Sequence, residues 1–302
     1  MEEGSVVEIA GLTHDYGEVV ALRDLTLSVP QGITGLVGAN GAGKTTMLRI
    51  LLGLLHQTKG LVSVLGHDPT SEPLEVRTRV GYMPESECLP DDQTAADFVS
   101  YTAQLAGLPP KDARRRSSET LFLVGLEEER FRYIGDFSTG MRQRVKLAQA
   151  IVHDPDLILL DEPASGLDPE GREQMLALIK RLATFDINII ISSHVLPDIE
   201  RTCDWVVMLD AGNLLRSAPL KGFDKDATVF VDVVQDADQV ADRLRSRGVT
   251  VVMEGTRLIV GPGEGLERAI LQATEASGSG LIRMGRGAAS LEDFFLRAGT
   301  GP

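Results

Sequence analysis

Residues 38–46 read Gly-Ala-Asn-Gly-Ala-Gly-Lys-Thr-Thr, and the rest of the chain is organised around this stretch. A short apolar run at 33–37 precedes it, and a run of helical character at 47–55 follows it. A glycine-rich loop between a strand and a helix turns successive backbone N–H groups toward one concavity at the positive end of the helix, which suits a polyphosphate. The candidate phosphate ligands are Gly38, Ala39, Asn40, Gly41, Ala42, Gly43, Lys44, Thr45 and Thr46.

Two side chains of this loop add chemistry that a plain glycine turn would not need. Lys44 carries a formal charge that can reach the β- and γ-phosphates of a nucleotide, and Thr45 offers a hydroxyl to Mg²⁺. The loop therefore predicts a site for a nucleotide triphosphate and its magnesium ion.

Composition restricts the partners of this 302-residue chain. The net charge of −14 and the lack of a Lys/Arg block argue against binding to nucleic-acid phosphates. Two distant cysteines, Cys88 and Cys203, fit a reducing compartment and favour neither a disulfide scaffold nor a zinc site. We see no signal-peptide pattern and no run of about 18 apolar residues. We therefore expect a cytoplasmic chain, and if it serves a membrane, another chain must cross it.

The order of predicted elements indicates an α/β fold with a second, smaller domain. Up to about residue 220, apolar strands alternate with helices, which implies right-handed crossovers and a mostly parallel sheet. Residues 84–154 are helical in character, with helices expected at 95–106, 113–123 and 142–152. From residue 223 the order becomes β-α-β-β-α-β, which is the ferredoxin-like order, followed by a helix at 290–297. We therefore expect domains at 1–222, with a helical subdomain at about 86–154, and at 223–302.

A second constellation lies at residues 157–163, which read Leu-Ile-Leu-Leu-Asp-Glu-Pro. Four apolar residues predict a strand that is buried on both faces, so Asp161 falls at the carboxyl edge of the sheet, from which the glycine loop also opens. Asp161 can thus complete the Mg²⁺ site that Thr45 begins. The adjacent Glu162 points elsewhere and can orient a water molecule beside the γ-phosphate.

With both constellations in place, residues 5–220 resemble the ATP-binding subunit of ABC transporters. Residues 137–144 are similar to the signature segment of that family, with Thr139 in place of the more usual Gly but with Ser138 and Gly140 retained. The resemblance implies a P-loop NTPase fold with a parallel-sheet core, an antiparallel β subdomain and a helical subdomain. It also implies a head-to-tail dimer, expected to be a homodimer, with two ATP molecules between the subunits. Asp168 belongs to a segment like the family's D-loop, which lies at that dimer contact.

The resemblance also implies roles for three further residues. His194 matches the switch histidine that contacts the γ-phosphate, so the expected catalytic residues are Glu162, His194 and Lys44. Tyr16 matches the aromatic residue that stacks on adenine. Glu85 stands where the family usually has Gln; it could still reach the Mg²⁺ ion, and its extra charge would alter nucleotide affinity or the dependence on Mg²⁺.

The resemblance extends weakly to the direction of transport. Pro84-Glu85 and the motif Ser-Leu-Glu-Asp-Phe-Phe-Leu at 290–296 are similar to branches that pair with multi-spanning export permeases of the ABC-2 type. We therefore expect an ATP hydrolase, peripheral on the inner face of the cell membrane, that drives export through a separate permease contacted by residues 86–110. The alternatives are a soluble ABC-type ATPase, disfavoured by the single cassette and the absence of sustained heptads, and a nucleotide-dependent switch without turnover, disfavoured by the Asp161-Glu162 pair.

Overall fold

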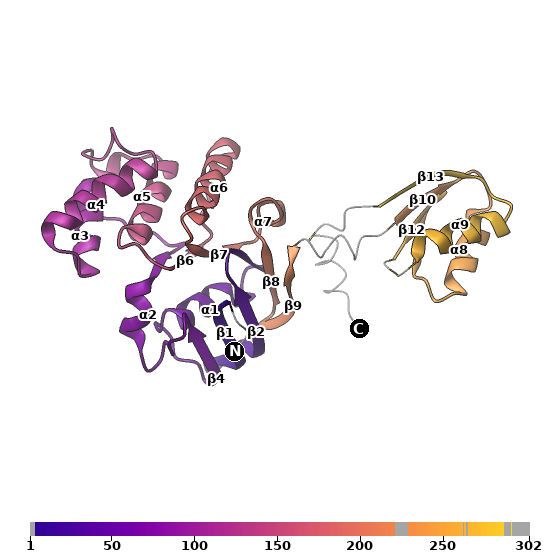
Figure 1. The fold of residues 1–302 in the computed structure, drawn as a ribbon, viewed down its shortest axis with the longest axis horizontal. Helices are drawn as coiled ribbons and strands as arrows, with labels where there is room; N and C mark the ends of the chain where they lie inside the picture. Colours follow the sequence, from indigo (N-terminus) through magenta and orange to yellow (C-terminus); the bar gives the residue numbers. More distant parts are fainter. Residues whose placement is uncertain (1–3, 221–228, 262, 264, 287–290, 292–302) are drawn as a thin grey trace. The chain divides into compact units, whose positions relative to one another are not determined.

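The computed structural model describes residues 4–220, 229–261, 263, 265–286 and 291. The chain divides into two compact units, Met1–Ala218 and Pro219–Pro302 (Figure 1). The division lies a few residues before the boundary that the sequence suggested.

The first unit is built on a six-stranded sheet in the order β5-β6-β7-β3-β8-β9. The four neighbouring pairs from β5 to β8 are parallel, as the alternation of strands and helices predicts. Every residue of β3 and β6 is buried, which explains why these strands are apolar throughout instead of alternating. The strands are β3 (Ile33–Val37), β5 (Val80–Met83), β6 (Leu157–Asp161), β7 (Asn188–Ser193), β8 (Trp205–Asp210) and β9 (Asn213–Pro219).

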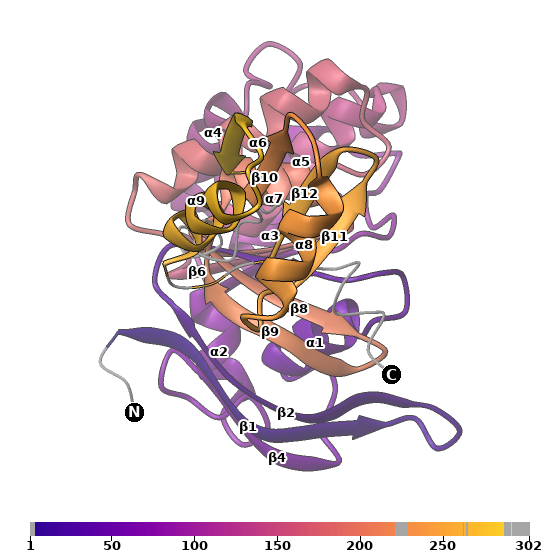
Figure 2. The ribbon, with the colours of Figure 1, turned by 90° about the vertical axis from the view of Figure 1, so that its right-hand side faces the viewer.

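A three-stranded antiparallel sheet, in the order β2-β1-β4, belongs to the same unit. It consists of β1 (Ser5–Asp15), β2 (Val20–Pro30) and β4 (Lys59–Val64), and Figure 2 shows it below α1. One hydrophobic core joins this sheet, α1 (Lys44–Leu51) and the six-stranded sheet, through residues such as Leu22, Leu48 and Leu36. The glycine loop is thus fixed between two sheets.

Helices make up most of the remainder of the first unit. They are α2 (Pro73–Arg79), α3 (Ala95–Leu105), α4 (Pro110–Leu123), the 3₁₀ helix η1 (Ile134–Asp136), α5 (Thr139–Ile151), α6 (Pro169–Ala183) and α7 (Leu196–Thr202). The structure starts α5 three residues before the expected position, because the Ser138 hydroxyl accepts a hydrogen bond from the Met141 N–H and caps the helix there. Helix α4 likewise begins early, since Pro110 is tolerated in the first turn.

Three further elements differ from the sequence prediction. Helix α1 ends at Leu51 and not at residue 55, because Gly53 has φ +64° and a Cβ there would collide with the Pro69 carbonyl oxygen. Helix α2 was not predicted; it buries a single side chain, Val76, and so has no apolar period. Strand β9 was also missed, because none of its residues is fully buried.

The second unit contains β10 (Val229–Val233), α8 (Ala237–Arg245), β11 (Val251–Glu254), β12 (Arg257–Val260), α9 (Leu266–Ala276) and β13 (Leu281–Arg286). Its strands form an antiparallel sheet in the order β11-β12-β10-β13. Side chains of both helices pack with Val231 and Leu258 in a separate hydrophobic core. The expected helix at 290–297 and the motif at 290–296 lie outside the described residues, apart from Leu291.

Candidate functional site

The glycine loop connects β3 to α1, and its backbone explains its glycines. Gly43 has φ +105°, and a Cβ there would lie 2.7 Å from the Ala21 carbonyl oxygen. A Cβ on Gly38 would lie 2.5 Å from the Leu209 carbonyl oxygen. Both neighbours are backbone atoms that cannot move aside cheaply, so these two positions require glycine. Gly41 has φ +83° and open space where its Cβ would be.

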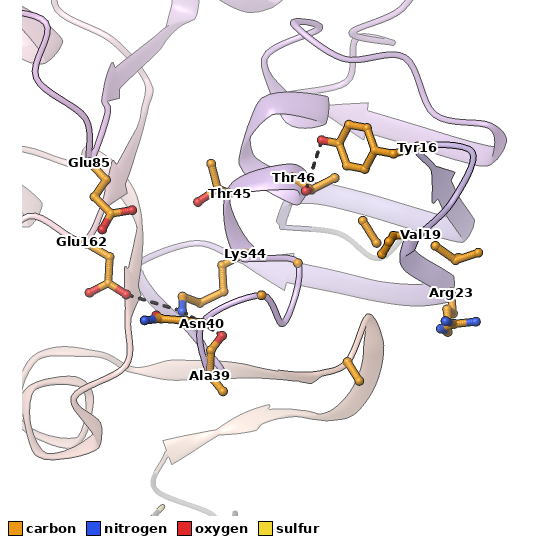
Figure 3. Close-up of a pocket in the computed structure, with 15 residues that line it drawn as sticks. Tyr16, Val19, Arg23, Ala39, Asn40, Lys44, Thr45, Thr46, Glu85 and Glu162 are labelled. Carbon is orange, nitrogen blue, oxygen red and sulfur yellow. Dashed lines mark hydrogen bonds and ion pairs between the residues drawn. The ribbon is translucent and has the colours of Figure 1, made fainter.

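A cavity of about 640 Å³ lies over this loop (Figure 3). Sequence reasoning singled out several of its walls, namely Tyr16, Ala39, Asn40, Gly41, Gly43, Lys44, Thr45, Thr46, Glu85 and Glu162. Five further walls belong to no motif and were missed. They lie in the turn before β2, at the start of β2 and in the turn after β8, and are Val19, Val20, Ala21, Arg23 and Ala211. Figure 3 shows Glu85 and Glu162 on one side of the cavity and Tyr16 on the opposite side. The two carboxylates and the aromatic ring thus border different ends of the cavity.

Lys44 links the loop to Glu162. Its Nζ donates a hydrogen bond to the Gly38 carbonyl oxygen at 2.7 Å and lies 3.4 Å from Glu162 Oε1. The side chain is almost fully buried. A buried ammonium is costly unless it is paired, so the carboxylate and the carbonyl hold it in a defined place at the loop.

Ser192, at the end of β7, joins the two adjacent carboxylates. Its hydroxyl accepts a hydrogen bond from the Glu162 N–H at 2.9 Å and donates one to Asp161 Oδ1 at 2.7 Å. Glu162 has φ +49°, a left-handed conformation that is unusual outside glycine. Sequence reasoning assigned no role to Ser192; the signal was the Ser-Ser-His run after an apolar strand.

His194 contacts the outer end of Glu162. Its Nδ1 lies 3.0 Å from Glu162 Oε2, and its side chain is about half exposed, at 53%. It stands outside the walls of the large cavity and beside a smaller hollow formed with Asp198 and Arg172. Glu162 is therefore held between Lys44 on one oxygen and His194 on the other.

The residues expected to hold Mg²⁺ all carry oxygen donors, of which those of Thr45 and Glu85 border the cavity, whereas Asp161 is not among its walls. Asp161 is buried, and its Oδ2 has no hydrogen-bond partner. The Thr45 hydroxyl and the Glu85 carboxylate border the cavity. Within the described residues there is no cluster of three or more His, Cys, Asp or Glu side chains that could hold a metal. Mg²⁺ needs no such cluster, because it binds one or two carboxylates together with water and substrate phosphates. The donor set fits this ion.

The negative charge of Asp161 reaches a neighbouring strand. Burial raises the pKa of Tyr82 on β5 to about 12, and the nearby Asp161 carboxylate adds to this effect. The Tyr82 hydroxyl therefore stays protonated across the physiological range.

Tyr16 follows β1 and borders the opposite end of the cavity. Its hydroxyl lies 3.4 Å from Thr46 Oγ1, and its ring meets the edge of His14 at a centroid distance of 4.5 Å. Tyr16 as a whole is 54% exposed. An exposed ring held from one side can offer a face to an aromatic ligand.

The signature-like residues lie elsewhere on the first unit. Ser138 caps α5, and with Gly140 it lines a separate hollow of about 190 Å³ that also includes Leu167. Asp168 caps α6 by accepting a hydrogen bond from the Gly171 N–H at 2.9 Å. Ser138 and Asp168 are exposed. A single chain thus does not bring these residues to the glycine loop.

The chain is similar to known proteins both in sequence and in structure. The family model described as "ABC transporter" matches residues 22–165. The chain is 35% identical, over 93% of its length and 78% of the relative, to the uncharacterized ABC transporter ATP-binding protein sll0415 of Synechocystis. It is 33% identical, over 97% of its length and 90% of the relative, to the Nod factor export ATP-binding protein I of Cupriavidus pinatubonensis. A solved structure described as an ATP binding subunit of an ABC transporter matches at 26% identity with a TM-score of 0.65, over 89% of this chain and 100% of that one.

The described residues contain no helix with the length and apolarity required to span a bilayer.

Proposed function

Because this chain belongs to the ATP-binding proteins of ABC transporters, a family of ATPases, we propose that it hydrolyses ATP to drive export through a separate membrane permease. The observation that carries the proposal is the chain of contacts Lys44–Glu162–His194 beside the glycine loop. The relative named for Nod factor export, matched over nearly its whole length, supports the direction. The chain would lie peripherally on the inner face of the membrane, with residues 86–110 toward the permease.

Each side chain of the site has a defined task in this proposal. Glu162 accepts a hydrogen bond from the attacking water and orients it toward the γ-phosphorus. Lys44 and the N–H groups of the loop stabilise the negative charge on the phosphates, while His194 holds the Glu162 carboxylate and contacts the γ-phosphate. A Mg²⁺ ion held by Thr45, Asp161 and Glu85 would neutralise charge on the β- and γ-phosphates. Tyr16 would stack on adenine.

We infer that two copies of the chain complete each other's sites. Ser138 and Asp168 are exposed and Gly140 is partly exposed, and none of them lines the cavity, so they are available to a second subunit. Backbone N–H groups and a hydroxyl at the start of α5 suit the γ-phosphate of an ATP bound on the partner. ATP would then bridge the subunits and favour the closed dimer by its higher affinity for that state.

We also propose that residues 223–302 form a ferredoxin-like domain that regulates or stabilises the dimer. The helices α8 and α9 pack on one face of its sheet. Val252 and Ile282 are more than half exposed, although their strands belong to that sheet. Exposed apolar side chains on a sheet are suited to contact with another protein surface.

The decisive experiment uses Glu162→Gln, which keeps the size of the side chain and removes its charge. We expect the purified variant to bind MgATP, to hydrolyse it about 100-fold more slowly or worse, and to shift from monomer to dimer when MgATP is added. Turnover is measured by phosphate release, and mass by light scattering. Glu75→Gln, an exposed change on α2, is the matched control and should behave as wild type.

Each contrary result would remove a defined part of the proposal. Wild-type turnover in Glu162→Gln would remove the catalytic role of Glu162. A monomer with ATP bound would show that a different chain completes the site. A failure of the wild-type chain to bind ATP would overturn the assignment of the cavity.

A further inference from the structure

A buried lysine lies behind the cavity wall that contains Glu85. Lys146, on α5, is 1% exposed and is among the largest fully buried side chains of the chain. Its Nζ donates a hydrogen bond to the backbone carbonyl oxygen of Glu85 at 2.9 Å. An ammonium group is rarely buried this deeply, because its desolvation costs several kcal/mol unless polar partners surround it. The deep burial of this ammonium group therefore needs a structural explanation.

Lys146 is the middle one of three polar anchors on one face of α5. Gln149 donates a hydrogen bond to the Tyr82 carbonyl oxygen at 3.1 Å, and Arg142 reaches Glu87 Oε2 at 3.1 Å and Asp91 Oδ1 at 2.8 Å. Positions 142, 146 and 149 recur at the spacing of a helix face. All three hold residues 82–91, the segment in which β5 leaves the sheet. Glu85 sits in this segment, so its position depends on α5.

The charges around Lys146 match this arrangement. Burial lowers the pKa of Lys146, the nearby Cys88, Glu87 and Glu85 act in the opposite direction, and the positive charge of Arg142 adds to the lowering. Two carboxylates thus favour the charged form of the lysine. The carboxylates of Glu85 and Glu162 both line the cavity. The positive charge of Lys146 therefore lies close to a part of the cavity wall that carries two negative charges.

We propose that Lys146 is a positioning residue: it fixes the backbone of Glu85 so that the Glu85 carboxylate faces the bound Mg²⁺ and γ-phosphate. The inference rests on the proposed function for the identity of the ligand. It assigns to α5, the helix that Ser138 caps at its start, a second task at the cavity of its own subunit. Lys146 and Glu85 should then act as a pair, so that losing the lysine matters only while the carboxylate is present.

The test is a double-mutant cycle read by binding. Lys146→Met keeps an unbranched side chain and removes the charge and the donor, and Glu85→Ala removes the carboxylate. The affinity of each full-length variant for fluorescent ATP is measured by titration in excess Mg²⁺ and in EDTA. The ratio of these two affinities is the Mg²⁺-dependent gain. We expect Lys146→Met to lower this gain at least fivefold in the Glu85 chain and less than twofold in the Glu85→Ala chain.

The cycle separates positioning from simple loss of charge. Direct long-range effects of two charges on ATP add, whereas an effect of Lys146 through Glu85 does not. Lys180→Met, which removes one exposed positive charge from α6, is the charge-matched control and should leave the gain unchanged. If Lys146→Met does not fold, Lys146→Arg, which keeps the charge and the donor, should retain at least half of the wild-type gain.

The outcomes also separate this inference from the proposed function. An equal loss of the gain in the Glu85 and Glu85→Ala chains would show that Lys146 is merely structural and would overturn the inference alone. A loss of the gain in Lys146→Arg as large as that expected for Lys146→Met would do the same. A wild-type chain that binds no ATP under either condition would overturn the proposed function, and the inference with it.

Discussion

At the scale of single residues, the site depends on one hydroxyl to which the sequence analysis assigned no role. Asp161 and Glu162 are adjacent in sequence, and two neighbouring carboxylates would ordinarily repel and compete for the same partners. The Ser192 hydroxyl contacts both, from a strand some 30 positions further along the chain. It satisfies one oxygen of Asp161 and leaves the other, Oδ2, without a partner and therefore available to a cation.

Ser192→Ala should therefore weaken both the fold and the reaction. The variant leaves the Glu162 N–H and Asp161 Oδ1 without their shared partner, which costs about 1–3 kcal/mol of the free energy of unfolding. We expect a loss of this size in urea denaturation and a fall in ATPase rate of about tenfold or more. Ser193→Ala is the control, because the Ser193 hydroxyl contacts the Val195 N–H within its own turn. Equal ATPase rates in the two variants would contradict the role of Ser192.

At the scale of elements, α5 is fixed to β5 by close backbone contact. A Cβ on Gly81 of β5 would collide with the Ala150 carbonyl oxygen near the end of α5, so only glycine permits this approach. Directly after the helix, His153 is largely enclosed, and its Nε2 has no hydrogen-bond partner. Burial lowers the pKa of His153 from its ordinary value of 6.5, although a hydrogen bond with the backbone of Val80 opposes the shift.

This histidine predicts a pH dependence of stability. The unfolded chain takes up a proton on His153 at a higher pH than the folded chain does, so the free energy of unfolding falls as the pH drops below about 6.5. Above that pH both states are neutral at His153, and this contribution is constant. One proton can account for at most about 1.4 kcal/mol per pH unit. We expect urea denaturation between pH 7.5 and 5.5 to show a smaller loss of stability in His153→Gln than in wild type; identical losses would contradict this account.

At the scale of the whole molecule, two units with separate hydrophobic cores share one chain. The first contains the whole of the cavity over the glycine loop. Because its core involves only residues before the division, we expect it to bind ATP without the second unit.

Deletion of residues 225–302 tests the proposed role of the second unit. We expect the shortened chain to bind ATP within about twofold of the full chain and to form the MgATP-dependent dimer less readily, with a dimer dissociation constant raised about tenfold or more. Such a change equals about 1.4 kcal/mol of dimer stability. Analytical ultracentrifugation of Glu162→Gln with and without the deletion measures it. Unchanged dimerisation together with an unchanged ATPase rate would remove the role of this unit.

The sequence alone determined the elements and residues whose signals are local. The glycine loop between a strand and a helix, the four apolar residues before Asp161 and the alternation of strands and helices all depend on near neighbours, and the parallel sheet agrees with them. Helix α2 and strand β9 were not predicted, because they bury little apolar surface and therefore show no periodic pattern of apolar residues.

Only the tertiary structure decided which distant side chains meet. Ser192 between Asp161 and Glu162, Lys146 beneath Glu85 and the walls at Arg23 and Ala211 come from separate strands, turns and helices. Nothing in the local sequence distinguishes these residues from others of their type, because packing alone brings their side chains to the site. The sequence states which atoms can bond, whereas the packing of the core sets the distances that select the bonds formed.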